Sequence, residues 1–268
     1  MGRVIGVIGC GNMGGALLQG FLQVAKENTY LAYTRSTERL APFEAMGVRR
    51  MSSAKELCAC ADLVVLAVKP GQVREVLESV SSDLDHQTLL LSIAAGVTLS
   101  DLTKMTQGRC PLIRCMPDTP ALVGKGVFAF AFSSAVPATE SEAILTLFGK
   151  LGCCFEFPEE KFAAFSALIG AGPAYVFSVM QALTQAGVTL GFGHAESRKM
   201  VEALFEGSAF LAMQSAEHLT ALRDAVCSPA GLTIDGVNEL DRRGLTGILV
   251  DAVLAAYARG KAMESAKD

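Results

Sequence analysis

The sequence has no cluster of basic residues, no CxxC pair and only three histidines, and these absences exclude several classes of protein. With a formal net charge of −4, the chain is a poor partner for nucleic acid or an anionic membrane surface. No histidine stands at metal-ligand spacing from the eight cysteines. We therefore expect reduced cysteines in a cytosolic protein, with no disulfide framework and no metal site.

The first ten residues, MGRVIGVIGC, lack the features of a signal peptide, because the apolar run is short and leads into a glycine motif. This indicates a cytoplasmic protein. The 268 residues are enough for one large or two ordinary domains. A hydrophobic content of 51% with 19% charged residues is high for a monomer and suggests that surface is buried between subunits.

No charged residue occurs from Phe162 to Gly193. Pro173 suits the first turn of a helix, which we expect to run to about Leu190 with apolar residues all around it. Glycines and glutamines interrupt the stretch and no basic cluster flanks it, which argues against the alternative of a membrane span. A helix of this kind must be buried on all sides, so we expect a second subunit to cover it.

The N-terminus carries a glycine motif in the context of strand, tight turn and helix. Val4–Ile8 is a short β-branched run, and apolar residues recur at helical spacing after the motif. A pyrophosphate would rest on the N–H groups where this helix begins. The alternative is a glycine-rich turn without a ligand. The predicted cofactor contacts here are Ile8, Gly9, Cys10, Gly11, Asn12, Met13 and Gly14.

A second strand, Tyr30–Tyr33, ends in Thr34, Arg35 and Ser36. An NAD site would place a carboxylate at this strand end to accept from the ribose 2′-OH. Two hydroxyls and a guanidinium instead suit a 2′-phosphate. We therefore predict NADPH as the cofactor, with NADH as the weaker alternative. A solvated turn in which Ser36 caps a helix is the other interpretation.

Two further apolar runs, Leu63–Val68 and Leu89–Ile93, are typical of buried parallel strands. Ligands bind beyond the carboxyl ends of such strands. The residues predicted there as cofactor contacts are Ala67, Val68, Lys69, Pro70, Ala95 and Gly96. Lys69 could equally be an ordinary surface lysine. The crossover helices are expected over Ala41–Met46, Ser53–Cys60 and Val73–Val80.

The strand Leu112–Cys115 leads into Met116–Pro120, where two prolines predict a stiff loop without regular structure. This loop is either a rigid connector or a wall of the nicotinamide pocket. A strand, helix and strand follow over Gly126–Phe132, Thr139–Gly152 and Cys153–Phe157. The first domain should therefore span residues 1–158 and the second residues 159–268.

The second domain shows only helical patterns. Helices are expected over Ala195–Ser215, Glu217–Ala225, Leu232–Arg242 and Thr246–Met263. The third helix follows a loop rich in Ser, Pro and Gly, and its free N–H groups make an anion site. The fold class is therefore α/β, with a Rossmann-like dinucleotide-binding domain followed by an all-helical domain.

Six segments together resemble the pyrroline-5-carboxylate reductase family, and the resemblance is collinear over essentially the whole chain. The glycine motif is generic, whereas the Ala-Val-Lys-Pro, Gly-Pro-Ala-Tyr and Val-Cys-Ser-Pro-x-Gly-x-Thr segments are specific in combination. The segments are Ile8–Gly14, Ala67–Pro70, Ser92–Val97, Met116–Pro120, Gly170–Tyr175 and Val226–Thr233.

The resemblance implies an oxidoreductase that reduces the cyclic imine of 1-pyrroline-5-carboxylate to L-proline with NADPH or NADH, the last step of proline biosynthesis. It also implies a cytoplasmic enzyme and a homodimer formed through interlocked C-terminal helices, possibly a pentamer of dimers. The helical domain would thus be a dimerisation domain.

The family assigns Thr233 as the catalytic hydrogen-bond partner of the ring nitrogen. Residue type alone favours a helix-capping hydroxyl at this position. The predicted substrate-binding residues are Ser228, Pro229, Ala230, Gly231, Leu232 and Thr233.

Two positions depart from the family pattern. Asp118 stands where the family usually has Asn, and Ala230 where it usually has Gly. An extra carboxylate in the pocket would repel an anionic substrate, and Ala tolerates positive φ poorly.

Two other functions share some of these sequence features. A related imine or β-hydroxyacid reductase would share the sheet, but the latter usually needs a lysine on the long helix, which is uncharged here. A non-catalytic NADP-binding regulator is disfavoured by the intact motifs.

Overall fold

The computed structural model describes residues 2–265. Residue contacts divide the chain into two compact units, which we call unit 1 (Met1–Gly170 with Tyr257–Asp268) and unit 2 (Ala171–Ala256). The predicted boundary between residues 158 and 159 separates domains by function, whereas these units are defined by contacts. The predicted boundary therefore stays a prediction. Residues 266–268 of the second predicted domain lie outside the described residues.

Unit 1 is built on a sheet that has eight strands within the described residues, in the order β3-β2-β1-β4-β5-β6-β7-β8. Neighbouring strands are parallel except for the antiparallel pair β6 and β7. The order 3-2-1-4-5-6 is that of dinucleotide-binding folds. The strands are β1 Val4–Ile8, β2 Thr29–Tyr33, β3 Arg49–Arg50, β4 Leu63–Leu66, β5 Leu89–Ser92, β6 Leu112–Pro117, β7 Gly126–Phe132 and β8 Gly152–Glu156.

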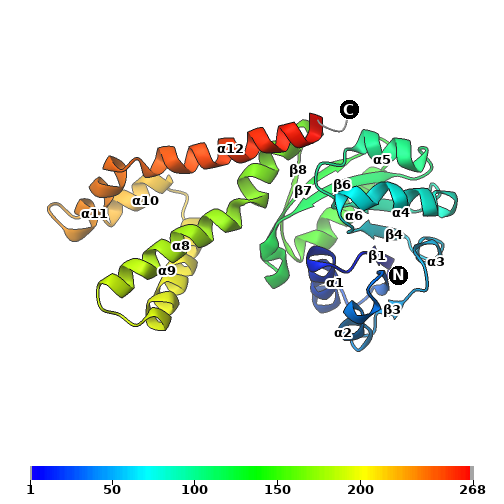
Figure 1. The fold of residues 1–268 in the computed structure, drawn as a ribbon, viewed down its shortest axis with the longest axis horizontal. Helices are drawn as coiled ribbons and strands as arrows, with labels where there is room; N and C mark the ends of the chain where they lie inside the picture. Colours follow the sequence, from blue (N-terminus) through cyan, green and yellow to red (C-terminus); the bar gives the residue numbers. More distant parts are fainter. Residues whose placement is uncertain (1, 266–268) are drawn as a thin grey trace. The chain divides into compact units, whose positions relative to one another are not determined.

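Helices cover both faces of this sheet (Figure 1). Alternate strand residues point to opposite faces. Val7 and Val65 pack with residues of α1 and α6, whereas Ile8 and Val64 pack with residues of α3, α4 and α5. The helices of unit 1 are α1 Asn12–Val24, α2 Ala41–Glu44, α3 Ala54–Cys58, α4 Val73–Val80, α5 Leu99–Thr106, α6 Ala138–Gly149 and α7 Phe162–Phe165.

The sheet confirms the predicted parallel α/β architecture but corrects one local expectation. The predicted irregular loop Met116–Pro120 is wrong: Met116 and Pro117 belong to strand β6, and Thr119 and Pro120 open a 3₁₀ helix over Thr119–Val123. Pro117 lies opposite Phe128 of β7, and it stands beyond the last residue of β6 that pairs with β5, Arg114. Proline has no backbone N–H, but no hydrogen bond to β5 is lost, because the pairing with β5 ends before Pro117. Helix α5 was not predicted; its N-cap, Thr98, forms a capping box with Asp101.

Unit 2 is all-helical within the described residues, as predicted. Helices α8 and α9 lie side by side (Figure 1). They approach closely at Gly187, where an added Cβ would lie 2.5 Å from the Ser197 hydroxyl oxygen. The helices are α8 Gly172–Thr189, α9 His194–Gln214, α10 Leu219–Ala225, α11 Leu232–Arg242 and α12 Leu245–Ser265, whose last part belongs to unit 1.

Helix α8 is not buried on all sides by its own chain. Of its residues, all of which the structure describes, only Thr184 is buried, and Phe177 is 62% exposed. The helical stretch Glu159–Thr189 is long and apolar enough to cross a membrane by length and composition, which is weak evidence for a span. Polar interruptions such as Gln181 and Gln185 favour a protein partner over lipid as the cover for this helix.

The cysteines are all free, and four of them are buried: Cys10, Cys58, Cys110 and Cys115. Burial raises the pKa of the Cys10 thiol to about 11 and that of Cys58 to about 12. These groups therefore stay protonated near neutral pH and act as small apolar side chains. Within the described residues, no group of three or more His, Cys, Asp or Glu could hold a metal ion.

Candidate functional site

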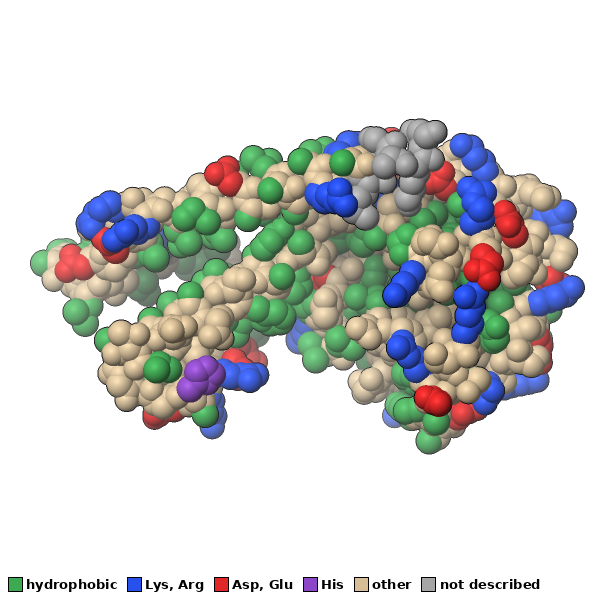
Figure 2. Space-filling model, in the orientation of Figure 1, with side chains coloured by type: hydrophobic (Ala, Val, Ile, Leu, Met, Phe, Trp, Pro, Cys, Tyr) green, Lys and Arg blue, Asp and Glu red, His purple; other side chains and the backbone are tan. Residues whose placement is uncertain are grey.

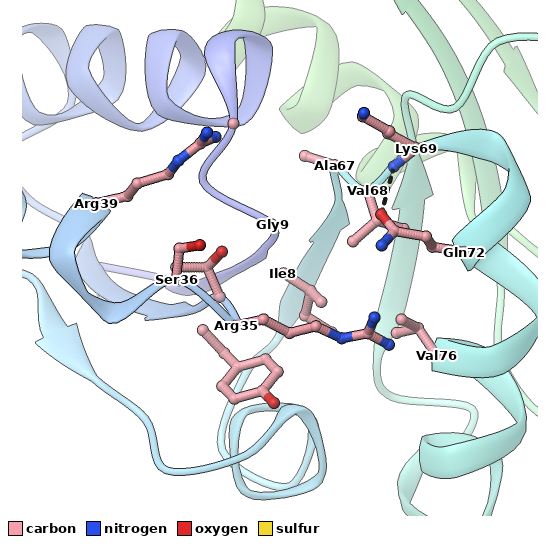
Figure 3. A pocket seen from close by; sticks show the side chains of 13 residues that line it. Ile8, Gly9, Arg35, Ser36, Arg39, Ala67, Val68, Lys69, Gln72 and Val76 are labelled. Atoms are coloured by element: carbon pink, nitrogen blue, oxygen red, sulfur yellow. Dashed lines mark hydrogen bonds between the residues drawn. The ribbon is translucent and has the colours of Figure 1, made fainter.

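A cavity of about 370 Å³ lies at the carboxyl ends of β1, β2 and β4 (Figure 3). The strand order reverses between β1 and β4, which is where dinucleotide folds bind their ligand. We call this cavity the cofactor pocket. It is lined by Ile8, Gly9, Gly11, Tyr33, Thr34, Arg35, Ser36, Arg39, Ala67, Val68, Lys69, Gln72 and Val76.

The glycines shape the floor of this pocket. Gly9 has φ +98°, and a Cβ there would lie 2.7 Å from the carbonyl oxygen of Ala67. A Cβ on Gly14 would lie 2.0 Å from the carbonyl oxygen of Gly9. Neither position can carry a side chain, so helix α1 begins directly against the strand turn. At Gly11 the nearest atom to an added Cβ is an Arg39 guanidinium nitrogen, 3.8 Å away.

The helix end is therefore open toward the pocket. Gly11 caps α1 without a side-chain hydrogen bond, and the first turn of the helix holds no acidic residue. The first N–H groups of a helix have no partner within the helix and attract anions. We call Gly9, Gly11 and Gly14, together with the first N–H groups of α1, the glycine cradle. It fits the pyrophosphate of a dinucleotide.

Three cationic side chains line the pocket, and within the described residues no carboxylate does. Arg35 follows β2, and its guanidinium lies 2.5 Å from a carboxylate oxygen of Glu75 on α4. Arg39 comes from the short 3₁₀ turn Thr37–Arg39 and extends toward the start of α1 (Figure 3). Lys69 is exposed beyond β4, and its backbone N–H donates to the Gln72 side chain at 3.4 Å. We call Arg35, Arg39 and Lys69 the cationic rim of the pocket. Their positive charges suit a phosphorylated ligand.

Nine of the sixteen residues predicted as cofactor contacts line this pocket. They are Ile8, Gly9, Gly11, Thr34, Arg35, Ser36, Ala67, Val68 and Lys69. The other seven are outside the lining: Cys10, Asn12, Met13, Gly14, Pro70, Ala95 and Gly96. Cys10 is part of the buried core, and Gly14 lies under the turn. Their assignment as contacts stays a prediction.

Four lining residues were not predicted from the sequence: Tyr33, Arg39, Gln72 and Val76. Arg39 carried a signal, since it stands four residues after Arg35 and offers a second guanidinium. Gln72 and Val76 come from the segment after Pro70 and from α4. Nothing in their residue types points to a ligand.

The six residues predicted to bind substrate form one compact segment in unit 2, which we call the α11 entry segment (Ser228–Thr233). The Gly231 N–H donates to the Ser228 carbonyl at 3.0 Å, which closes a turn before α11. A Cβ on Gly231 would lie 2.2 Å from the Ser228 hydroxyl oxygen, so a side chain there would force the turn open.

Thr233 is exposed and is the second residue of α11. The helix is capped by Gly231 without a side-chain hydrogen bond, so Thr233 is not its capping residue. Among the described residues, no hydrogen bond of the Thr233 hydroxyl is found. The hydroxyl is accessible to solvent, and its role as a ligand contact stays a prediction.

The two departures from the family pattern lie in different units and affect different properties, the backbone conformation at Ala230 and the burial of a carboxyl group at Asp118. Ala230 has φ 56°, a left-handed conformation that glycine adopts more easily. Asp118 is only 5% exposed and accepts a hydrogen bond from the Val127 N–H at 2.9 Å. Desolvation raises its pKa above the ordinary value. Its hydrogen bond with Val127 holds the start of β7 in place, and Asp118 does not line the cofactor pocket.

Family models match both ends of the chain. Residues 159–263 match the family described as pyrroline-5-carboxylate reductase dimerisation. Residues 4–96 match the family described as NADP oxidoreductase coenzyme F420-dependent. The second match contains every residue that lines the cofactor pocket.

Three relatives match over nearly the whole chain at 28–35% identity. The chain is 35% identical to the pyrroline-5-carboxylate reductase of Escherichia coli (strain K12) over 257 residues, which is 94% of this chain and 95% of that protein. A pyrroline-5-carboxylate reductase structure from Coxiella burnetii matches with a TM-score of 0.92 at 28% identity, covering 98% of this chain and 99% of the other. A Plasmodium falciparum pyrroline carboxylate reductase structure with NADP bound matches with a TM-score of 0.86 at 29% identity, covering 98% of each chain. The chain therefore belongs to the pyrroline-5-carboxylate reductase family.

Proposed function

We propose that this protein reduces 1-pyrroline-5-carboxylate to L-proline with NADPH, the last step of proline biosynthesis, and uses NADH less well. The observation that carries the proposal is the glycine cradle with its cationic rim, in a chain whose relatives match it from end to end. The enzyme is an oxidoreductase that acts on a carbon–nitrogen double bond. When bound, the nicotinamide supplies the hydride.

The cofactor contacts are proposed in three groups. The first is the glycine turn with the residue before it, where backbone N–H groups face the pyrophosphate. The second is the end of β2, where two hydroxyls and the guanidinium of Arg35 suit a 2′-phosphate. The third is the carboxyl ends of β4 and β5. The residues are Ile8–Gly14, Thr34–Ser36, Ala67–Pro70, Ala95 and Gly96.

The substrate contacts are proposed on the α11 entry segment. The N–H groups that open α11 bind the substrate carboxylate, because they lack partners within the helix. The Thr233 hydroxyl forms a hydrogen bond with the ring nitrogen, which gains a proton as the imine becomes an amine. An exposed hydroxyl that caps no helix supports this role.

The proposed assembly is a homodimer formed through unit 2, possibly further assembled into a pentamer of dimers, in the cytoplasm. Hydrophobic side chains run along the helices of unit 2 (Figure 2). Phe210 is 60% exposed, Leu211 59% and Met213 72%. Exposed apolar surface of this extent is typical of a protein interface. The dimerisation family match over residues 159–263 supports the same conclusion.

The test is an assay of NADPH oxidation by the purified full chain with 1-pyrroline-5-carboxylate as the only substrate. We expect oxidation that depends on the substrate, and L-proline as the product identified by chromatography. Parallel assays should contain a β-hydroxy acid with NADP, or an acyclic imine with NADPH. The proposal fails if NADPH binds but 1-pyrroline-5-carboxylate causes no oxidation, or if a parallel substrate reacts faster.

A further inference from the structure

The rim of the cofactor pocket holds an ion pair that a phosphate would have to open. Arg35, at the end of β2, lines the pocket, and Glu75 lies in the first turn of α4. Their side chains are 58% and 67% exposed. Arg35 lowers the pKa of Glu75, mainly through their hydrogen bond, so this carboxylate is ionised near neutral pH. Among the described residues, no other lining cation forms an ion pair.

Glu75 reaches the rim from a helix that also lines the pocket. Gln72 and Val76, on either side of it in the chain, are both lining residues. The Arg35 side chain extends from the end of β2 toward Val76 (Figure 3). A ligand that carries a phosphate to Arg35 therefore meets the negative charge of Glu75 at the same guanidinium.

We propose that Glu75 is a specificity-determining residue that sets the preference between NADPH and NADH. With NADH, Arg35 keeps its bond to Glu75 and loses nothing. With NADPH, Arg35 must leave Glu75 or share itself with the 2′-phosphate, and the two negative charges repel each other. The inference rests on the proposed use of NADPH and deepens it by naming the residue that limits the preference.

The expected effect is modest because exposed ion pairs are weak. Freeing Arg35 alone should improve NADPH binding by about 2–5-fold, since affinity scales with the fraction of the competent conformation. Removing the repulsion raises the expected gain to about 3–10-fold. The gain should shrink at high salt, because screening weakens both effects.

The first experiment compares Glu75→Gln with Glu78→Gln in the full chain. Glu78 is a matched control, because it lies on the same helix and pairs with Arg74 at 3.9 Å, away from the pocket lining. Binding of NADPH and NADH is measured by nicotinamide fluorescence. Binding of 2′,5′-ADP and 5′-AMP, measured by calorimetry, isolates the phosphate.

We expect E75Q to bind NADPH and 2′,5′-ADP about 3–10-fold more tightly, with NADH and 5′-AMP within about 2-fold of the unchanged protein. E78Q should change none of the four by more than about 2-fold. Weaker or unchanged NADPH binding in E75Q overturns the proposal, and so does an equal gain for NADPH and NADH.

A double-mutant cycle tests whether Arg35 carries the effect. In an Arg35→Gln background, Glu75→Gln should give less than about a 2-fold gain for 2′,5′-ADP, because only the repulsion remains. A full gain without Arg35 would contradict the proposed competition. None of these measurements needs 1-pyrroline-5-carboxylate. A protein that shows the expected binding but no turnover would therefore refute the proposed reaction and leave the role of Glu75 intact.

Discussion

Units 1 and 2 differ in where their apolar side chains lie. Unit 1 contains all three buried hydrophobic clusters of the described residues, on both faces of its sheet and beside α7. Among the described residues of unit 2, only Thr184, Ser197 and Val201 are buried, and Leu232 is 95% exposed. The first unit can stabilise itself, whereas the second needs surface from elsewhere. In one chain, the residues that stabilise the fold and the residues available for association with a partner thus lie in different segments.

The most damaging substitution tests the self-sufficiency of unit 1. Phe148 is fully buried and makes edge-on contacts with Phe21, Phe128 and Phe130 at centroid distances of 5.1, 5.3 and 5.1 Å. Phe148→Ala should lower the free energy of unfolding by about 3–5 kcal/mol, from lost burial and the cavity left behind. Denaturant titration measures this loss. Phe210→Ala in unit 2 is the matched control and should weaken association more than the stability of unit 1.

Charge on α8 tests the dependence of unit 2 on a partner. Ala182 is exposed in the single chain and would be buried in the proposed interface. Ala182→Glu should destabilise the dimer by several kcal/mol, on the order of 3–5, because an unpaired carboxylate would be buried. Analytical ultracentrifugation should show dissociation or loss of soluble protein. A stable dimer at micromolar concentration would remove α8 from the interface.

Thr233 tests whether unit 2 also contributes chemistry. Its hydrogen bond to the ring nitrogen should strengthen as the amine forms, so Thr233→Ala should lower kcat/KM by about 10–100-fold, or about 1.4–2.7 kcal/mol. NADPH affinity should not change, because the cofactor pocket belongs to unit 1. Thr233→Ser keeps the hydroxyl and should recover most of the loss. If both variants keep full turnover, the proposed role is wrong.

Asp118 should make the stability of unit 1 depend on pH. Desolvation raises its pKa in the folded state, so the ionised form opposes folding as pH rises above the unfolded value. Asp118→Asn keeps an acceptor for the Val127 N–H and carries no charge. We expect the variant to be more stable by about 1 kcal/mol near pH 7. The difference should disappear toward about pH 4, and melting temperatures at both pH values would show this.

Ala230 gives a mild effect in unit 2. Its φ of 56° is strained for alanine and free for glycine. Ala230→Gly should stabilise the folded chain by about 0.5–1 kcal/mol, after the entropy that glycine adds to the unfolded state. The matched control is Ala212→Gly within α9, which should destabilise the chain by about 1 kcal/mol because glycine is a poor helix former. Opposite signs for the two substitutions in thermal unfolding would establish the strain.

The sequence was sufficient to predict the parallel sheet, because buried runs such as Leu63–Leu66 are followed by glycine or proline within a few residues. Helix α5 was missed although Thr98 and Asp101 form a capping box and Leu99, Leu102 and Met105 recur at three-residue spacing. Its eight residues make only about two helical turns, so the pattern is short. Strand β6 continues through Pro117 because its neighbour β5 has already ended, a tertiary fact that no local rule contains.

The site was predictable to a similar extent. The glycine turn and the end of β2 were found, since strand and turn chemistry are local. Arg39 and Glu75 were not, because their relation to the pocket depends on how the turn after β2 and helix α4 fold over it. From the sequence, strain at Ala230 was expected only if its φ is positive. The structure gives a φ of 56°.

The return of the chain to unit 1 has a consequence for synthesis on the ribosome. Unit 2 is an insertion, because unit 1 contains residues on both sides of it. A Cβ on Gly260 would lie 4.0 Å from Ala163, which stands far earlier in the chain. The sheet of unit 1 is complete at Glu156, so it can fold while the rest emerges. Helix α12 reaches its place against α7 only after unit 2 has been translated, and a chain stalled within unit 2 would display a folded nucleotide-binding sheet without helix α12.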